Sequence, residues 1–191
     1  MKLSKYQKIG FILLSIFFLI YLFTAENIDK VLSDKIKKSP VLIEKYKEFN
    51  LDNTAKEIQF KRDITEDVIS TAKSFLGTPN KIGGTDLDYI DASGLVFVSI
   101  KNNSSIKFPR IAQEMARFGE IIIEPKYLKR GDLVFFFDTY EVNRIITSVG
   151  IYIGKGEFIT SSSSNGVIIK RIDDPYYWSK KFFYGTRIFN K

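Results

Sequence analysis

The sequence predicts an α+β domain in which helices come first and a small antiparallel sheet follows. Helix-spaced apolar residues dominate the stretch between about residues 63 and 119. Short apolar runs separated by glycine-containing turns come after it, a pattern typical of strands joined by hairpins. Strands joined by hairpins pair with their neighbours in sequence and form one sheet. The helices that precede them are then expected to pack on one face of that sheet.

Three helices are predicted in the first part of the domain. The first begins near Asp63 and ends at Gly77, a residue type that favours a helix C-terminus. The second starts at Asp91, whose carboxylate can accept hydrogen bonds from the first helical amides. The third has Pro109 as its first residue and ends at Gly119.

Five strands are predicted to follow the helices. Their ranges are Leu133–Phe137, Val149–Ile153, Glu157–Ser161, Val167–Ile172 and Phe183–Phe189. The first is an uninterrupted apolar run, so we expect it to be buried. An aromatic-rich stretch at residues 176–184 is interpreted as core or rim packing, with an exposed partner-binding patch as the alternative.

The N-terminal segment predicts a membrane helix. Residues 9–25 carry no charge and would span about 25 Å as a helix, close to the lower limit for crossing a bilayer. Lysines precede this run, so we expect anchoring in the inner membrane through residues 9–25, with the rest facing the periplasm or the exterior. The alternative is a signal cleaved after Ala25 and a secreted protein, although Phe23 stands where a small residue is expected.

The chain therefore divides into three predicted segments. Residues 1–25 form the anchor or signal, residues 26–62 a charged helical spacer, and residues 63–191 the α+β domain. The spacer contains two amphipathic stretches, Ile28–Lys38 and Pro40–Phe49. Because a proline disrupts the interior of a helix, these stretches are expected to be two separate helices.

Composition limits the partners and the chemistry. The chain of 191 residues has a formal net charge of +7. This charge is compatible with an ordinary soluble protein that has a basic surface, or with a protein that binds an acidic polymer or an anionic membrane face. Nucleic acid is not an expected partner, because neither a long Lys/Arg run nor a nucleic-acid motif occurs. The sequence contains no Cys and no His, so it lacks a thiolate and the only side chain with an unperturbed pKa near neutrality.

Neither a cofactor nor a metal ion is predicted. Asp86, Asp88 and Asp91 suggest oxygen ligands for Ca²⁺, but the twelve-residue loop pattern of such sites is not completed. We interpret this stretch as a solvated loop that ends in a helix cap. Any acid–base chemistry would have to use Asp, Glu, Lys or Tyr with a shifted pKa.

Four motifs occur in a fixed order along the domain. They are Gly77–Gly84, Asp91–Val96, Arg130–Phe137 and Ser148–Gly154. In content and order they resemble the NlpC-type endopeptidases, which are papain-like cysteine peptidases of the bacterial cell wall. The resemblance covers roughly residues 63–189 and implies a papain-like NlpC-type fold.

The resemblance also implies where catalytic groups would stand. In this family a thiol at a helix start is the nucleophile, an imidazole on a facing strand takes its proton, and a third polar group orients the imidazole. The corresponding positions here are Ala92, Ser148 and Thr160, and Asn80 replaces a tyrosine of the glycine-rich loop. Since the surrounding motif residues match while the chemical groups do not, the chain is identified as a catalytically inactive member.

Two functions without hydrolysis follow from this interpretation. In the first, the cleft binds peptidoglycan stem peptides, and the resemblance implies that Asp91 and Ser93 line its ligand end. In the second, the domain binds another protein of the cell envelope. An open polar cleft would favour the peptide, whereas a cleft filled by Asn80, Lys81 or residues 161–164 would favour the protein.

An active peptidoglycan hydrolase with a relocated nucleophile is the alternative of a different class. Ser93 and Ser148 are the serines that the motifs bring to the site, and either would need a base. With no histidine in the chain, a lysine is the remaining candidate base. Lys81 and Lys155 are the lysines nearest to the site in sequence.

Overall fold

A computed structural model of the chain describes residues 27–49 and 53–189. The chain falls into two compact units, one ending at Ile43 and the other beginning at Glu44. Residues 27–36 are helical, and a second helix, α2, runs over Pro40–Phe49. Both predicted spacer helices are therefore confirmed.

The predicted membrane segment, residues 9–25, lies outside the described residues. Among the helices of residues 27–49 and 53–189, none is long and apolar enough to cross a bilayer. The division of the chain at residues 25 and 62 stays a prediction.

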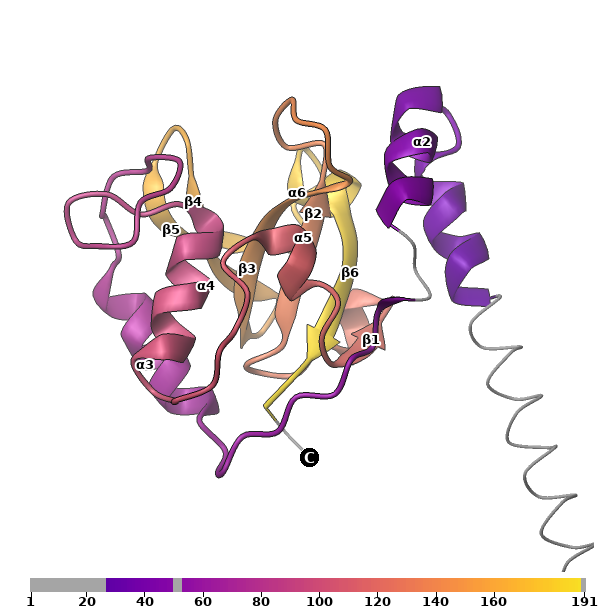
Figure 1. Ribbon diagram of the computed structural model, residues 1–191. Coiled ribbons are helices and arrows are strands. Elements are labelled where there is room, and N and C mark those ends of the chain that lie inside the picture. Colours follow the sequence, from indigo (N-terminus) through magenta and orange to yellow (C-terminus); the bar gives the residue numbers. More distant parts are fainter. Residues whose placement is uncertain (1–26, 50–52, 190–191) are drawn as a thin grey trace, which may run out of the picture. The chain divides into compact units, whose positions relative to one another are not determined.

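In the second unit three helices precede the strands, as predicted, and a further short helix lies between the last two strands (Figure 1). Its helical elements are α3 (Thr65–Ser74), α4 (Ala92–Lys101), α5 (Ala112–Met115), the 3-10 turn η2 (Pro125–Tyr127) and α6 (Trp178–Lys181). Its strands are β1 (Glu120–Ile122), β2 (Leu133–Phe137), β3 (Ile146–Gly154), β4 (Glu157–Ser162), β5 (Gly166–Arg171) and β6 (Phe182–Arg187). All strand pairs are antiparallel, so the α+β class and the antiparallel sheet are confirmed.

The sheet is not a simple meander. Its order is β1-β6-β2-β3-β4-β5, so the last strand in sequence lies between β1 and β2. Sequence reasoning missed β1, a three-residue strand whose pairing partner, β6, lies about 65 residues further along the chain. Such a short strand has no periodicity of its own, and only its distant partner defines it.

The third helix was predicted incorrectly. It begins at Ala112, because Ile111 has extended backbone angles (φ −103°, ψ 132°) and acts as the N-cap. The segment from Pro109 to Ile111 is therefore outside the helix. Its one charged side chain, that of Arg110, bonds to the loop before α4 and to the first turn of α4.

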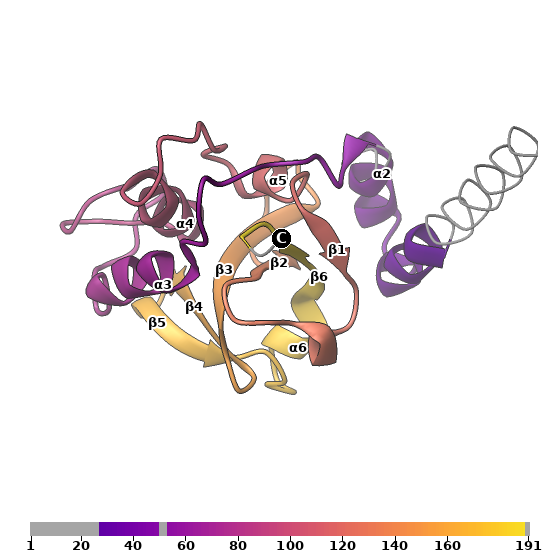
Figure 2. The same ribbon diagram turned by 90° about the horizontal axis from the view of Figure 1, so that it is seen from below.

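A cluster of buried aromatic and aliphatic side chains, called the second core below, covers the face of the sheet opposite to α5. Trp178 of α6 packs on Phe136 and Phe158, with ring centroids 4.8 and 5.1 Å apart. Figure 2 shows α5 and α6 on opposite sides of strands β2 and β6. The expectation that helices cover one face is thus incomplete, since the missed α6 covers the other.

The start of β2 is held by a buried carboxylate. Asp132 accepts hydrogen bonds from the Lys129 amide at 2.6 Å and from two nitrogens of Arg187 at 3.0 and 2.8 Å. Burial raises the pKa of Asp132 above its usual value, although the bonds from Arg187 and Lys129 work against that rise. The Arg-Gly-Asp turn therefore fixes the start of β2 to the end of β6.

We predict that Phe136→Ala lowers the free energy of unfolding by about 3–5 kcal/mol, because deleting a fully buried ring leaves a cavity. Chemical denaturation of the purified chain measures the change. The control is Tyr176→Ala, whose side chain is 87% exposed and whose loss should change stability by at most about 0.5 kcal/mol. Equal effects of the two substitutions would contradict the assignment of the second core.

Candidate functional site

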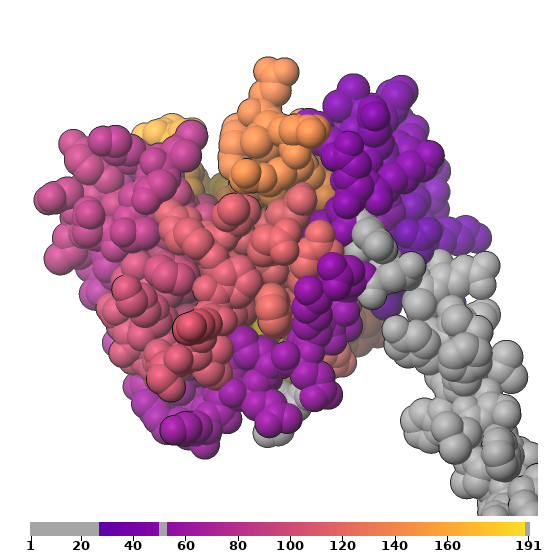
Figure 3. Space-filling model, in the orientation of Figure 1, coloured from indigo at the N-terminus to yellow at the C-terminus, as the bar shows by residue number. Residues whose placement is uncertain are grey.

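A cleft of about 820 Å³ opens beside the N-terminus of α4. This volume lies within the range of about 300–1,000 Å³ that is usual for small-ligand pockets. Its walls come from the loop before α4, the segment before α5, the β2–β3 loop, the start of β3 and the β4–β5 turn. Figure 3 shows it as a notch between the loop before α4 and the β2–β3 loop.

The structure brings most of the predicted site residues together. The residues that line the cleft include Asn80, Asp91, Ala92, Ser93 and Ser148. Thr160 does not line it: its side chain is fully buried, and its hydroxyl donates to the Val149 carbonyl at 2.8 Å. Thr160 thus lies on β4, the strand beside β3, and bonds the residue that follows Ser148.

Asp91 joins the loop before α4 to the helix itself. One carboxylate oxygen accepts the Gly94 amide at 2.6 Å, as expected for a helix N-cap, and the other accepts the Gly83 amide at 2.5 Å. The Ser93 hydroxyl also donates to Asp91, at 3.0 Å. Gly94 leaves room for this arrangement, because a Cβ atom there would stand 2.2 Å from the Gly84 carbonyl oxygen.

Arg110 is the site residue that sequence reasoning missed. Its two terminal nitrogens each bond one oxygen of Asp91 at 2.9 Å, in the two-pronged geometry that arginine forms with carboxylates. It also bonds the Ser93 hydroxyl at 2.8 Å and the Gly84 carbonyl at 3.0 Å. No local pattern marks it, since it comes from a segment that was assigned to a helix.

The charge of Asp91 is stabilised by these contacts. Burial by itself would raise the pKa of Asp91, but the hydrogen bonds from Arg110, Gly94 and Gly83 outweigh it and lower the pKa below its usual value. The carboxylate is therefore ionised at neutral pH and neutralised by Arg110. Because a lowered pKa makes a carboxylate a weaker base, Asp91 suits a structural role better than proton abstraction.

A second hydrogen-bond chain forms another part of the wall. The Asn80 side-chain amide donates to the Ser161 hydroxyl at 2.8 Å, and Ser161 donates to the Ile90 carbonyl at 2.7 Å. Over the part of the chain that the structure describes, no side-chain hydrogen bond is formed by Ser148. None of the described residues is therefore placed to accept a proton from Ser148.

The two lysines named as candidate bases do not line the cleft. Lys81 lies over the ring of Tyr89, with its ammonium 5.0 Å from the ring centroid, and Lys155 is in the β3–β4 turn. Lys170 of β5 does line the cleft, but within residues 27–49 and 53–189 it forms no hydrogen bond with a serine. The structure thus shows no serine–lysine pair among the residues it describes.

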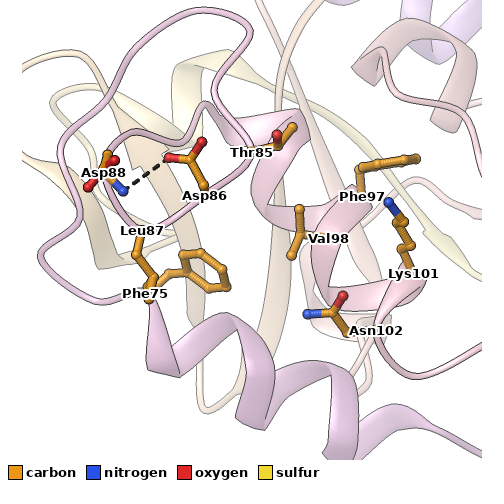
Figure 4. Close-up of a pocket in the computed structure, with 9 residues that line it drawn as sticks. All are labelled: Phe75, Thr85, Asp86, Leu87, Asp88, Phe97, Val98, Lys101 and Asn102. Atoms are coloured by element: carbon orange, nitrogen blue, oxygen red, sulfur yellow. Dashed lines mark hydrogen bonds between the residues drawn. The ribbon is translucent and has the colours of Figure 1, made fainter.

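A separate hollow of about 520 Å³ lies between α3, α4 and the part of the loop before α4 that contains Asp86 and Asp88 (Figure 4). The side chains that Figure 4 labels there include Asp86 and Asp88. Asp86 accepts the amides of Asp88 and Tyr89, both at 3.0 Å, so its carboxylate closes a turn. In the described parts of the chain, no group of three acidic residues could hold a metal ion, and Asp91 is bound to Arg110 instead.

We predict that Arg110→Met lowers the free energy of unfolding by about 2–3 kcal/mol at pH 7, because it leaves the Asp91 carboxylate, whose side chain is 16% exposed, without its charged partner. The pKa of Asp91 is lower in the folded than in the unfolded state, so its contribution is complete above the unfolded pKa of about 3.9 and is lost as the pH falls through the folded pKa. The difference between variant and wild type should therefore shrink in acid.

Denaturation curves between pH 7 and pH 2 measure this difference. The matched control is Arg171→Met, which removes an ion pair to Asp173 whose two side chains are 55% and 62% exposed and should change little at any pH. A difference for Arg110→Met that stays constant down to the lowest pH would show that Asp91 is not the partner responsible.

Comparison with known proteins places this geometry in a family. The sequence model described as the NlpC/P60 family matches residues 77–187. The chain is 35% identical over 116 residues to the probable endopeptidase NlpC of Escherichia coli K12, covering 61% of this chain and 73% of that protein. It is 32% identical over 136 residues to the gamma-DL-glutamyl hydrolase of Bacillus subtilis 168, covering 71% of this chain. The match spans only 32% of that hydrolase's length.

A solved structure shares the fold. RipD of Mycobacterium tuberculosis, described as a non-catalytic NlpC/p60 domain protein with an adaptation to peptidoglycan-binding function, superimposes with a TM-score of 0.50. The match has 24% sequence identity and covers 66% of this chain and 98% of RipD. The resemblance that the four motifs predicted is confirmed: the chain belongs to the NlpC/P60 family.

Proposed function

We propose that this domain binds peptidoglycan stem peptides without cleaving them. The observation that carries the proposal is an open cleft, lined by serines, asparagines and charged side chains as well as apolar ones, where Ala92 stands at the position that the resemblance gives to the nucleophile. The cleft is of a size to hold a small ligand, and the chain contains neither a thiol nor an imidazole anywhere. Binding of a peptide requires the open cleft, and it does not require a thiol or an imidazole.

The chemistry of the site argues against turnover. A methyl group at the start of α4 cannot attack a carbonyl carbon. Ser148 lines the cleft without a base, and the hydroxyl of Ser93 donates to Asp91 and accepts from Arg110. A serine becomes a useful nucleophile only when an adjacent group removes its proton.

The shape of the cleft supports a peptide ligand over a protein partner. Asn80 and residues 161–164 form part of its wall and leave its volume of about 820 Å³ open. Lys81, one of the residues that could have filled the cleft, does not line it and lies over Tyr89. RipD supplies a precedent within the fold, since that protein is described as non-catalytic and adapted to peptidoglycan binding.

An envelope protein is the second candidate partner. Tyr176 is 87% exposed and Tyr177 is 39% exposed, so part of the aromatic stretch before α6 is open to contact. The other aromatic side chains of that stretch, Trp178, Phe182, Phe183 and Tyr184, are buried in the core, which leaves a small patch. Both candidates agree with an expected location at the cell envelope, held there by residues 9–25 or secreted after their removal.

We predict that the purified full chain binds a synthetic stem tetrapeptide and returns it intact. Isothermal titration calorimetry measures binding, and mass spectrometry of the peptide after prolonged incubation measures cleavage. An active NlpC-type endopeptidase tested beside it shows that the peptide can be cleaved. Turnover that disappears in Ser93→Ala or Ser148→Ala would establish the active hydrolase with a relocated nucleophile instead.

We also predict that Ala92→Cys creates a thiol that iodoacetamide alkylates faster than free cysteine. The start of the ten-residue helix α4 favours the thiolate, since the helix dipole is positive there. Ser163→Cys in the exposed β4–β5 turn is the control and should react like free cysteine. The rates are measured by mass spectrometry under identical conditions.

Adding a base should then restore hydrolysis in part. The double variant Ala92→Cys/Ser148→His should exceed the single variant by roughly 10²-fold or more, the usual contribution of a positioned general base. Adding Thr160→His supplies the third group, although that position is fully buried and has to accommodate a ring. A folded double variant with an unreactive thiol would show that the cleft is covered, and would favour the protein partner.

A further inference from the structure

The cleft carries positive charge that its own residues do not neutralise. Its charged lining residues are Asp91, Arg110, Arg144, Lys170 and Asp174. Asp91 and Arg110 compensate each other through their paired hydrogen bonds, so neither contributes net charge to a ligand. Two cations and one carboxylate remain.

Arg144 and Lys170 are the two cations without a partner. Over the described residues, neither side chain forms an ion pair or a hydrogen bond, and both are only partly exposed. The remaining carboxylate, Asp174, already accepts the Tyr176 amide at 3.0 Å. An unpaired cation that is partly withdrawn from water gains more from an anionic ligand than a fully solvated one does.

The β2–β3 loop presents Arg144 from a fixed backbone. Gln113 of the α5 helix accepts the amides of Ile145 and Ile146 at 3.0 and 3.4 Å, directly after Arg144. At the other end of the loop, the Tyr177 hydroxyl donates to the Thr139 carbonyl at 3.3 Å. Because both ends are bonded to other elements, the loop holds its arginine toward the cleft without needing a ligand to order it.

Lys170 is held by the sheet. It belongs to β5, where it pairs with Phe158 of β4, and the Phe158 ring is fully buried in the second core. Arg144 and Lys170 therefore come from different elements, a loop and a strand, that line one cleft. Because their backbones are already held, only the two side chains have to be ordered when a ligand binds, which favours affinity.

We propose that Arg144 and Lys170 bind the carboxylates of an acidic peptide, and that these two side chains determine which stem peptides the cleft accepts. This inference rests on the proposed function and names the chemistry of its ligand. Arginine bonds a carboxylate through two parallel N–H groups, and lysine acts as a point charge. A peptide whose carboxylates are converted to amides loses both charge-assisted contacts.

The test compares two probes on the full chain by isothermal titration calorimetry. The first probe is a synthetic stem tripeptide with its glutamate and terminal carboxylates free, and the second is the same peptide with both groups amidated. The wild type should bind the acid at least tenfold more tightly than the amide. Arg144→Gln and Lys170→Gln should each weaken binding of the acid about tenfold and leave binding of the amide unchanged, because a charge-assisted contact is lost only with the acid.

Matched variants separate a direct contact from a loss of fold or of overall charge. Lys73→Gln removes one positive charge from the exposed side of α3 and should bind both probes like the wild type. Arg144→Lys keeps the charge and should retain part of the preference for the acid. Unfolding midpoints of all variants confirm that each is folded.

The outcomes distinguish this inference from the proposed function. Equal binding of both probes by the wild type would overturn the role of Arg144 and Lys170 while leaving peptide binding intact. Binding of neither probe would overturn the proposed function itself. Weakening by Lys73→Gln as large as that by Arg144→Gln would show that net charge acts without a specific contact, and would also overturn the inference.

Discussion

The arrangement of the cleft depends on the carboxylate of Asp91. It caps α4 through Gly94, holds the preceding loop through Gly83 and binds the guanidinium of Arg110, which arrives from the segment before α5. Three stretches that are separate in sequence therefore meet at one ionised group. Because the hydrogen bonds lower its pKa despite burial, this group stays charged at neutral pH. An apolar residue here would release the loop, the helix start and the arginine together.

The family frame is intact around a site that lacks the family's chemical groups. In the assignment that we propose, the helix start, the facing strand and the strand beside it carry Ala92, Ser148 and Thr160 in the places of nucleophile, base and orienting group. Removing a catalytic group leaves the geometry of a cleft unchanged when that geometry is held by other residues, and here Asp91 and Arg110 hold it. Under the proposed function, this separation is what allows the domain to bind a peptide without cleaving it.

Sequence patterns predicted correctly those elements that are determined by residues close together in the chain. The range of β2 was predicted in full because five consecutive buried apolar residues have few other structures open to them. The start of α4 followed from the capping chemistry of Asp91. The failures share a different cause: β1 exists only through pairing with β6, and Arg110 acts only through residues that lie about 20 positions earlier. Pro109 predicted a helix start that the extended backbone of this segment excludes. Tertiary contacts of this kind leave no signal in a single sequence.

The position of β6 within the sheet bears on how the chain matures. Strand β6 pairs with both β1 and β2. Therefore β1 cannot join the rest of the sheet until β6 has been made and Arg187 can pair with Glu120. During synthesis, β2 can pair with β3 but has an open edge on its other side. Exposed strand edges of this kind invite pairing with other chains, and contacts between residues far apart in sequence slow folding. The sheet therefore cannot be completed before its last strand has been made, and until then one edge of β2 stays open.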